Sequence, residues 1–338
     1  MDIRFERQLL AWLKPVSRSF YLSVRFLPRR IRPTIAVAYL LARASDTIAD
    51  ANALPADQRL ETLQRLAEAI HRDGIDLTSL VQECVRHQGT GGERLLLDAL
   101  PRILAAARRL PAPHHDLVED VLEKILRGQS LDLMRFEGKT GIHALKTDDE
   151  LDEYIYLVAG CVGEFWTKLC LWEWPGYSAL PETELIDLGI DFGKGLQLVN
   201  VLRDVPLDLR AGRCYLPVAV PERLIAEPGL GAGLYDAWFK RACLYLQAAW
   251  NYAGHIRPPS VRFACALPAL IGIRTLRLLA QAPPFSAGVK VRRTEVYRLA
   301  CQAFAAACSR PAHRWIGRRQ FGERRTSLTG LGGKKRGW

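Results

Sequence analysis

The feature that most limits the fold of this chain is the spacing of its apolar residues, which recur every three or four positions along nearly all of its length. That spacing places side chains on one face of an α-helix, whereas a half-buried strand alternates polar and apolar residues. Alternation of the strand type is scarce here. Nine windows show the helical pattern: 33–50, 56–72, 93–109, 115–135, 148–172, 183–205, 233–255, 261–281 and 293–308. The sequence therefore predicts an all-α fold.

The breaks between these windows fall at glycine and proline, and no linker or internal repeat divides the chain into parts of different composition. With 338 residues, 49% of them hydrophobic and 25% charged, the chain has enough material for a large buried core. We predict one all-α domain over residues 1–308, a helical bundle that encloses a central cavity.

Neither a signal peptide nor a membrane-spanning helix is expected. The first residues, 1–7, lack an apolar stretch behind a basic cap. The longest uncharged apolar run, 263–273, is much shorter than the roughly 20 residues that a spanning helix needs. The eight cysteines show no CxxC spacing, and several lie in apolar stretches, which is typical of reduced, buried thiols. These features predict a cytoplasmic protein without disulfides or a zinc site.

The net charge of +11 is concentrated at the C-terminal end. Residues 309–338 hold nine Lys or Arg, one acid and six glycines, whereas residues 1–308 hold 38 basic and 35 acidic side chains. We therefore predict a disordered basic tail over residues 309–338. It is either a solvated extension or a segment that contacts an anionic membrane surface. The nearly balanced body and the absence of a recognition motif argue against nucleic acid as a partner.

A stripe of polar side chains runs along the predicted helix at 33–50 and includes two aspartates four residues apart. Tyr39, Arg43, Asp46 and Asp50 follow one another at steps of four, three and four in an otherwise apolar segment. A helix that is apolar nearly all round is expected to be buried, so its polar stripe faces protein or an internal cavity. Buried carboxylates need cations or hydrogen-bond donors.

A second stripe repeats the pattern with Gln197, Asn200, Asp204 and Asp208 among Leu and Val residues. Other carboxylate pairs in the chain have the same four-residue spacing, and most such pairs lie on solvated faces. The apolar surroundings distinguish these two stripes from those pairs. Asn200 adds a neutral oxygen ligand, which suits a hard cation such as Mg²⁺. Two satisfied buried polar networks are the structural alternative.

Acidic stripes with arginines beside them, Arg43 and Arg203, indicate bound diphosphate. Carboxylates alone would repel it, whereas Mg²⁺ can bridge carboxylate and phosphate oxygens. The chain has no P-loop and no GxGxxG after a predicted strand, so a nucleotide-binding fold is not indicated.

Four segments, taken together, resemble the squalene/phytoene synthase family of head-to-head prenyl transferases. They occur in the family's order, and each is weak alone. They are an SRSF segment at 17–20, the first aspartate-rich helix at 39–50, a YIYLVAGCVG helix at 154–163 and the second aspartate-rich region at 197–217. The resemblance implies an isoprenoid-synthase-type fold and, as substrate, two molecules of farnesyl diphosphate.

The resemblance also implies roles for individual residues. Mg²⁺, or Mn²⁺, would be bound by Asp46, Asp50, Asn200, Asp204 and Asp208. The catalytic groups would be Tyr39, Arg43, Tyr154, Asp46, Asp50, Asp204 and Asp208, with Tyr154 as the acid/base candidate. Substrate would contact Ser17, Arg18, Ser19, Phe20, Gln197, Arg203, Arg213 and Tyr215.

Two later segments resemble squalene synthases within this family: FACALP at 263–268 and GVKVRR at 288–293. The likeness implies reduction of the intermediate, presqualene diphosphate, to squalene by NADPH. Lys290 and Arg292 are then the candidates for binding phosphate of the cofactor or the substrate. Contact with a membrane surface is expected, because substrate and product are hydrophobic. The contact is expected to be peripheral, because no apolar anchor follows residue 308.

Two departures from the family pattern affect the proposed metal site. Ala49 stands where squalene synthases usually have a Glu, so one ligand is missing. Pro206 lies between Asp204 and Asp208, and proline inside a helix removes a backbone hydrogen bond and can kink the helix. The sequence therefore predicts a disturbed register at Asp208.

Two alternatives stay open. One is a different reaction on the same fold, which forms phytoene, dehydrosqualene or presqualene diphosphate without reduction. The other is a relative without catalytic activity that serves as an assembly or scaffold protein, because a fold does not fix a function. The oligomeric state does not follow from the sequence.

Overall fold

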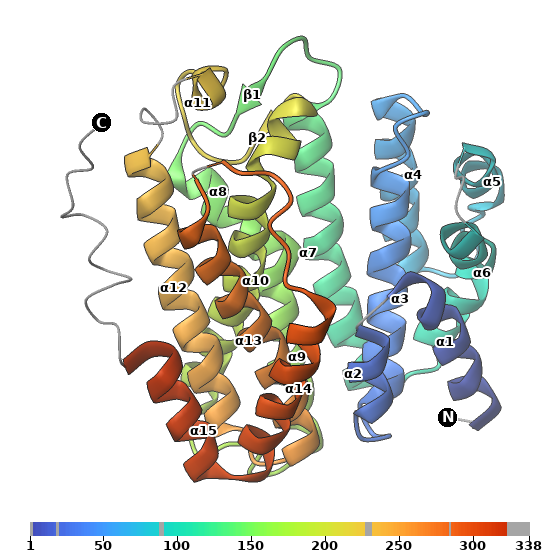
Figure 1. The fold of residues 1–338 in the computed structure, drawn as a ribbon. Coiled ribbons are helices and arrows are strands. Elements are labelled where there is room, and N and C mark those ends of the chain that lie inside the picture. Colours follow the sequence, from blue (N-terminus) through green and yellow to red (C-terminus); the bar gives the residue numbers. More distant parts are fainter. Residues whose placement is uncertain (1–2, 18–19, 88–90, 227–231, 284, 323–338) are drawn as a thin grey trace. The chain divides into compact units, whose positions relative to one another are not determined.

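The computed structural model describes all residues except 1–2, 18–19, 88–90, 227–231, 284 and 323–338. The described residues form helices and one short parallel ladder, so the predicted all-α class is confirmed (Figure 1). The helices divide into two compact units, residues 1–140 with 156–175 and residues 141–155 with 176–338. We call them unit 1 and unit 2.

Unit 1 is built around one buried helix, α3, which packs against α1, α4, α6 and α7. Pro33 in its first turn supplies a backbone angle suited to a helix start. Its Ile, Val, Leu and Ala side chains are buried nearly all round. The helices of unit 1 are α1 (Ile3–Val16), α2 (Phe20–Phe26), α3 (Arg32–Ala49), α4 (Ala56–His71), α5 (Thr78–His87), α6 (Gly91–Ala107), α7 (Ala112–Phe136), η1 (Tyr156–Gly160) and α9 (Cys161–Glu173).

Unit 2 is built around the long helix α10, which packs against α12 and α13 (Figure 1). A Cβ at Gly195 of α10 would lie 2.8 Å from Tyr245 Cβ of α12, so glycine is what allows this close approach. The elements are β1 (His143–Ala144), α8 (Asp148–Ile155), α10 (Glu182–Arg210), β2 (Arg213–Cys214), α11 (Arg223–Ala226), α12 (Ala232–His255), α13 (Pro259–Gln281), α14 (Arg293–Cys308), α15 (Arg310–Gly317) and η2 (Arg318–Gly322).

The nine predicted helical windows are all helical in the structure. The prediction of a disordered tail from residue 309 is wrong for residues 310–322, which form α15 and η2. Ser309 caps α15 by accepting a hydrogen bond from the Ala312 backbone N–H. His313 and Ile316, three residues apart, bury one face of this helix. The rest of the predicted tail, 323–338, lies outside the described residues.

The predicted YLVAG helix contains a π-turn. Residues 148–173 form one helical run in which Tyr156–Gly160 has π geometry. A Cβ at Gly128 of α7 would lie 3.0 Å from Leu157 Cβ, so α7 approaches this turn closely. π-turns inside α-helices are frequent at functional sites.

All eight cysteines are free thiols, as predicted, and five of them are buried. Two helical stretches, 148–173 and 259–281, are long and apolar enough to cross a membrane by composition. Of the most apolar part of each, 44% and 56% is buried inside the structure. Core helices of globular proteins have the same character, so these stretches are weak support for a membrane span.

The expected disturbance at Pro206 is absent: α10 continues through it to Arg210. Pro206 has no N–H to donate to the carbonyl oxygen of Leu202, four residues earlier. The Tyr235 hydroxyl of α12 donates to that oxygen instead, at 3.4 Å. The second acidic motif therefore stays on one helix as far as Asp208.

Replacing Tyr235 with Phe is expected to lower the free energy of unfolding by about 1 kcal/mol, because the buried Leu202 carbonyl loses its donor. In a Pro206→Ala background the backbone N–H gained by the substitution can donate to the same oxygen. Tyr235→Phe should therefore lower the free energy of unfolding clearly less in that background. Urea denaturation of the four proteins in this double-mutant cycle measures the difference. Equal costs in both backgrounds would show that the Tyr235 hydroxyl does not compensate for Pro206.

Candidate active site

The first acidic stripe lies on α3 in unit 1 and is organised by Arg43. Its guanidinium donates to Asp46 Oδ2 at 2.7 Å and to Glu93 Oε1 of α6 at 2.6 Å. Glu93 was not predicted from the sequence, because it lies 50 residues away on another helix. The arginine thus ties the motif to α6 and neutralises part of its negative charge.

Burial controls the electrostatics of this stripe. Burial raises the pKa of Asp46, and the Arg43 guanidinium opposes part of that rise. Burial also raises the pKa of Tyr39, so its hydroxyl stays protonated at neutral pH. Asp50 caps the C-terminus of α3 and is exposed, and its backbone N–H donates to the Asp46 carbonyl at 2.9 Å. Asp46 and Asp50 therefore keep the four-residue helical spacing.

The end of α1 lies against this stripe. The Tyr39 hydroxyl donates to the Val16 carbonyl at 3.4 Å, and the buried Ser17 hydroxyl donates to the Leu13 carbonyl at 2.7 Å. The hydroxyl of Ser17 therefore caps its own helix. Arg18 and Ser19 lie outside the described residues, as does the side chain of Phe20.

The second acidic stripe lies on α10 in unit 2. Arg203 Nε donates to Asp204 Oδ1 at 2.8 Å. This hydrogen bond raises the pKa of Arg203, and the charge of Asp208 adds to the rise. The Asn200 amide nitrogen donates to Gln197 Oε1 at 3.3 Å. Each acidic helix thus carries an arginine–aspartate pair within a half-buried stripe.

Three of the predicted side chains meet in unit 2 around Tyr154 of α8. The rings of Tyr154 and Tyr215 stack, with centroids 4.5 Å apart and planes 21° from parallel. Gln197 Nε2 of α10 donates to the Tyr154 hydroxyl at 3.5 Å. We call Tyr154, Gln197 and Tyr215 the tyrosine cluster. It places a phenol hydroxyl beside Gln197, which lies one helical turn before Asn200.

A short ladder holds Tyr215 in place. His143 pairs with Arg213 and Ala144 with Cys214 in the parallel ladder of β1 and β2. Gly212, just before β2, has a φ of +77°, and a Cβ there would lie 3.1 Å from the Gly141 carbonyl oxygen. Glycine is therefore needed at the turn that leads from α10 to Arg213 and Tyr215.

Asp152, two residues before Tyr154, positions α8, a role that the sequence did not reveal. It accepts hydrogen bonds from Lys194 Nζ of α10 at 2.6 Å and from Tyr245 Oη and Arg241 Nη2 of α12, both at 3.1 Å. Asp152 also lies four residues after Asp148, a spacing that most often marks a solvated face. The spacing gave no signal, because the partners come from other helices.

A separate group of possible metal ligands lies on α7 of unit 1. Ligand atoms of His115, Asp116 and Glu119 lie within 4.8 Å of one another, and His71 Nδ1 of α4 is 3.2 Å from Glu119 Oε1. This group contains none of the aspartates predicted to bind metal. Its neighbour His114 is buried between Thr34 Oγ1 at 2.8 Å and Glu173 Oε1 at 2.9 Å, which indicates a structural role.

The two basic residues proposed for phosphate lie in unit 2, just before α14, and both are exposed. Arg292 is the N-cap of α14, and its backbone N–H donates to Glu295 Oε2 at 3.3 Å. Glu295 also accepts from Arg274 Nη2 at 2.7 Å. This capping box fixes the backbone that carries Lys290 and Arg292. No described contact joins them to the tyrosine cluster.

Comparison with known proteins gives matches over most of the chain. The family model for squalene/phytoene synthase matches residues 13–295. A bifunctional lycopene cyclase/phytoene synthase of Gibberella fujikuroi is 29% identical over 234 residues, which cover 65% of this chain and 37% of that protein. Squalene synthase 1 of Arabidopsis thaliana is 28% identical over 295 residues, which cover 83% of this chain and 67% of that protein. The chain thus spans little more than a third of the fungal relative.

The fold itself matches a solved structure. The complex of TcSQS with the ligand BPH1237 superposes with a TM-score of 0.76 at 22% sequence identity, covering 99% of this chain and 94% of that one. With the family match over residues 13–295, the conclusion is direct: this chain belongs to the squalene/phytoene synthase family, head-to-head prenyl transferases of isoprenoid biosynthesis.

Proposed function

We propose that this protein condenses two molecules of farnesyl diphosphate head to head, through presqualene diphosphate, to squalene. The observation that carries the proposal is the arginine–aspartate pair on each acidic helix, Arg43 with Asp46 and Arg203 with Asp204. Each pair combines a cation for phosphate oxygens with a carboxylate for a metal ion. The match to squalene synthase 1 of Arabidopsis thaliana over 83% of the chain supports the choice of product.

The residues present fit Mg²⁺ or Mn²⁺. The donors are carboxylate oxygens of Asp46, Asp50, Asp204 and Asp208 with the side-chain oxygen of Asn200, the hard ligands that these cations prefer. In Asn200 the amide nitrogen makes the bond to Gln197, which suits its oxygen to a cation. When bound, the cation neutralises diphosphate and makes it a better leaving group.

The chain's own residues would hold the substrates and keep water away. Arg43 and Arg203 bind phosphate oxygens as the diphosphate leaves the first farnesyl chain with the electron pair of the C–O bond. The double bond of the second chain attacks the allylic cation so formed, and a proton is lost to close the cyclopropane. The stacked rings of Tyr154 and Tyr215 offer π faces that stabilise positive charge. The Tyr154 hydroxyl, held by Gln197, is the candidate that passes the proton to the released diphosphate.

For the second half of the reaction, NADPH would supply hydride to the cation formed when presqualene diphosphate ionises. Lys290 and Arg292 carry the positive charge to bind a phosphate group of the cofactor or the substrate. The cytoplasmic placement and the contact with a membrane surface, from which hydrophobic substrate is taken, form part of this proposal.

The test is product analysis after incubation of the purified protein with farnesyl diphosphate and Mg²⁺, with and without NADPH. Squalene formed only with NADPH is the expected result. Presqualene diphosphate or dehydrosqualene in both reactions would overturn the reductive step and leave the condensation. Formation of phytoene from geranylgeranyl diphosphate would show that the substrate is geranylgeranyl diphosphate and not farnesyl diphosphate. No turnover of either substrate would favour the scaffold alternative and point to Ala49, where a metal ligand is missing.

A further inference from the structure

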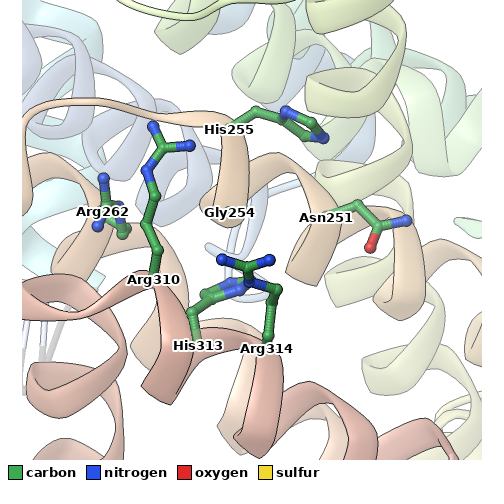
Figure 2. Close-up of a pocket in the computed structure, with 7 residues that line it drawn as sticks. All are labelled: Asn251, Gly254, His255, Arg262, Arg310, His313 and Arg314. Atoms are coloured by element: carbon green, nitrogen blue, oxygen red, sulfur yellow. The ribbon is translucent and has the colours of Figure 1, made fainter.

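A basic pocket of about 380 Å³ lies in unit 2, where α15 packs beside α12 (Figure 2). Arg310 and Arg314 of α15 extend toward the C-terminal end of α12 and the start of α13. None of the aspartates of the two acidic stripes lines this pocket. The lining residues are Asn251, Gly254, His255, Arg262, Arg310, His313 and Arg314.

The pocket concentrates positive charge without acidic partners. Three arginines line it, and no carboxylate does. Among the described residues, no carboxylate forms an ion pair with Arg310 or Arg314. Burial and the nearby Arg310 charge lower the pKa of Arg262. Cations crowded in this way favour an anion as the occupant.

One wall of the pocket is fixed by Arg262, which is 6% exposed. Its Nη1 donates to the Ala307 carbonyl at 2.8 Å, and its Nε donates to the Ile256 carbonyl at 2.9 Å. These bonds tie together the segments that follow α12 and end α14. The guanidinium charge is therefore held by carbonyl dipoles and contributes a fixed positive potential.

A second wall is fixed by His313, which is 8% exposed. Its ring stacks on Trp250, with centroids 4.2 Å apart and planes 9° from parallel. A Cβ at Gly254 would lie 2.7 Å from His313 Cε1, so only glycine leaves room for the ring. His313 Nε2 is buried and has no hydrogen-bond partner among the described residues. In a neutral imidazole one ring nitrogen donates and the other accepts, so the partner that Nε2 lacks is a donor such as water, and the ring shapes this wall rather than supplying charge.

We propose that this pocket binds a phosphate group, with Arg310 and Arg314 as its charged ligands and Asn251 and His313 as polar neighbours. Guanidinium groups pair with phosphate oxygens through parallel hydrogen bonds. The volume exceeds that of one phosphate, so the group belongs to a larger molecule or binds with water.

Two sources carry this chemistry, a soluble phosphate and the headgroup of an anionic lipid. Trp315, next to Arg314 on α15, is 58% exposed, and the Arg319 guanidinium lies 5.0 Å from the centre of its ring. Exposed tryptophan beside arginine is typical of helices that rest on a membrane surface. This favours a lipid headgroup, and the experiment separates the two sources.

The experiment measures binding of the full-length chain to two probes. One probe is inorganic phosphate, followed by calorimetry. The other is vesicles of phosphatidylcholine with or without phosphatidic acid, followed by co-sedimentation. The test variant is Arg310→Gln with Arg314→Gln. The control is Arg298→Gln with Arg318→Gln, which removes the same charge from exposed positions outside the pocket.

We expect the test variant to weaken binding of phosphate or of phosphatidic acid vesicles by about tenfold or more, and the control to weaken it by less than about threefold. Loss with vesicles alone identifies a lipid headgroup, and loss with inorganic phosphate identifies a soluble ligand. Equal losses in both variants would overturn the proposal, because general surface charge then explains binding. Binding of neither probe by the unaltered protein would overturn it as well. Neither readout depends on the proposed reaction.

Discussion

Replacing Asp204 with Asn is expected to lower kcat for farnesyl diphosphate by about 100- to 1000-fold, with little change in stability. The exchange keeps the shape of the side chain but removes the negative charge that would hold Mg²⁺ and that pairs with Arg203. Loss of electrostatic stabilisation at a leaving group typically amounts to several kcal/mol, and each 1.36 kcal/mol is about tenfold in rate. Steady-state kinetics at several Mg²⁺ concentrations is the measurement.

The same helix offers a matched control for this prediction. Asp187 lies on α10, is exposed and is not part of the stripe. Asp187→Asn should leave kcat within about twofold. We also expect the Asp204 variant to need more Mg²⁺ for half-maximal rate, because one ligand has lost its charge. A variant with unchanged kcat and unchanged Mg²⁺ dependence would remove Asp204 from the metal site.

The second large effect is a loss of stability in acid that originates at His313. Burial and the charge of Arg262 lower its pKa in the folded protein from 6.5 to about 4, with further contributions from His255 and Arg310. Below pH 6.5 the unfolded chain binds a proton that the folded chain does not bind. The free energy of unfolding therefore falls as the pH decreases from 6.5 toward 4, by up to about 3 kcal/mol, and this contribution is constant above 6.5.

A His313→Gln variant isolates this contribution from that of the carboxylates, which titrate in part of the same range. Gln does not titrate, so the stability gap between the unaltered protein and the variant should narrow as the pH falls from about 7.5 to about 4.5. Urea denaturation at several pH values measures it. Parallel curves for the unaltered protein and His313→Gln would contradict the burial of a neutral imidazole.

Most of the fold could be predicted from the sequence because helical periodicity is a local signal. The long windows around α3, α10 and α13 are strongly apolar, and their bounds are close to those observed. The helix at 310–317 was missed because five residues of the basic segment 310–319 are arginine or glycine, which conceals the face formed by His313 and Ile316. The error at Pro206 had another cause: the donor that compensates for it, Tyr235, comes from a different helix.

The candidate site also has a part that the sequence predicts and a part that it does not. The stripes that contain Arg43 with Asp46 and Arg203 with Asp204 follow from spacing within one helix, and the structure pairs each arginine with its aspartate. Glu93 and Asp152 could not be predicted, because their partners lie 50 and 42 or more residues away on other helices. Contacts between helices depend on packing, which a single sequence does not display.

The path of the chain through its two compact units has a consequence for how such a protein can change in evolution. The chain passes from one unit to the other after residues 140, 155 and 175, and the second of these points lies inside the helical run 148–173. Neither unit is therefore a contiguous stretch of sequence. Recombination between relatives at a single point would mix parts of both units, so we expect successful exchanges to involve the whole helical domain, joined to other domains at its ends.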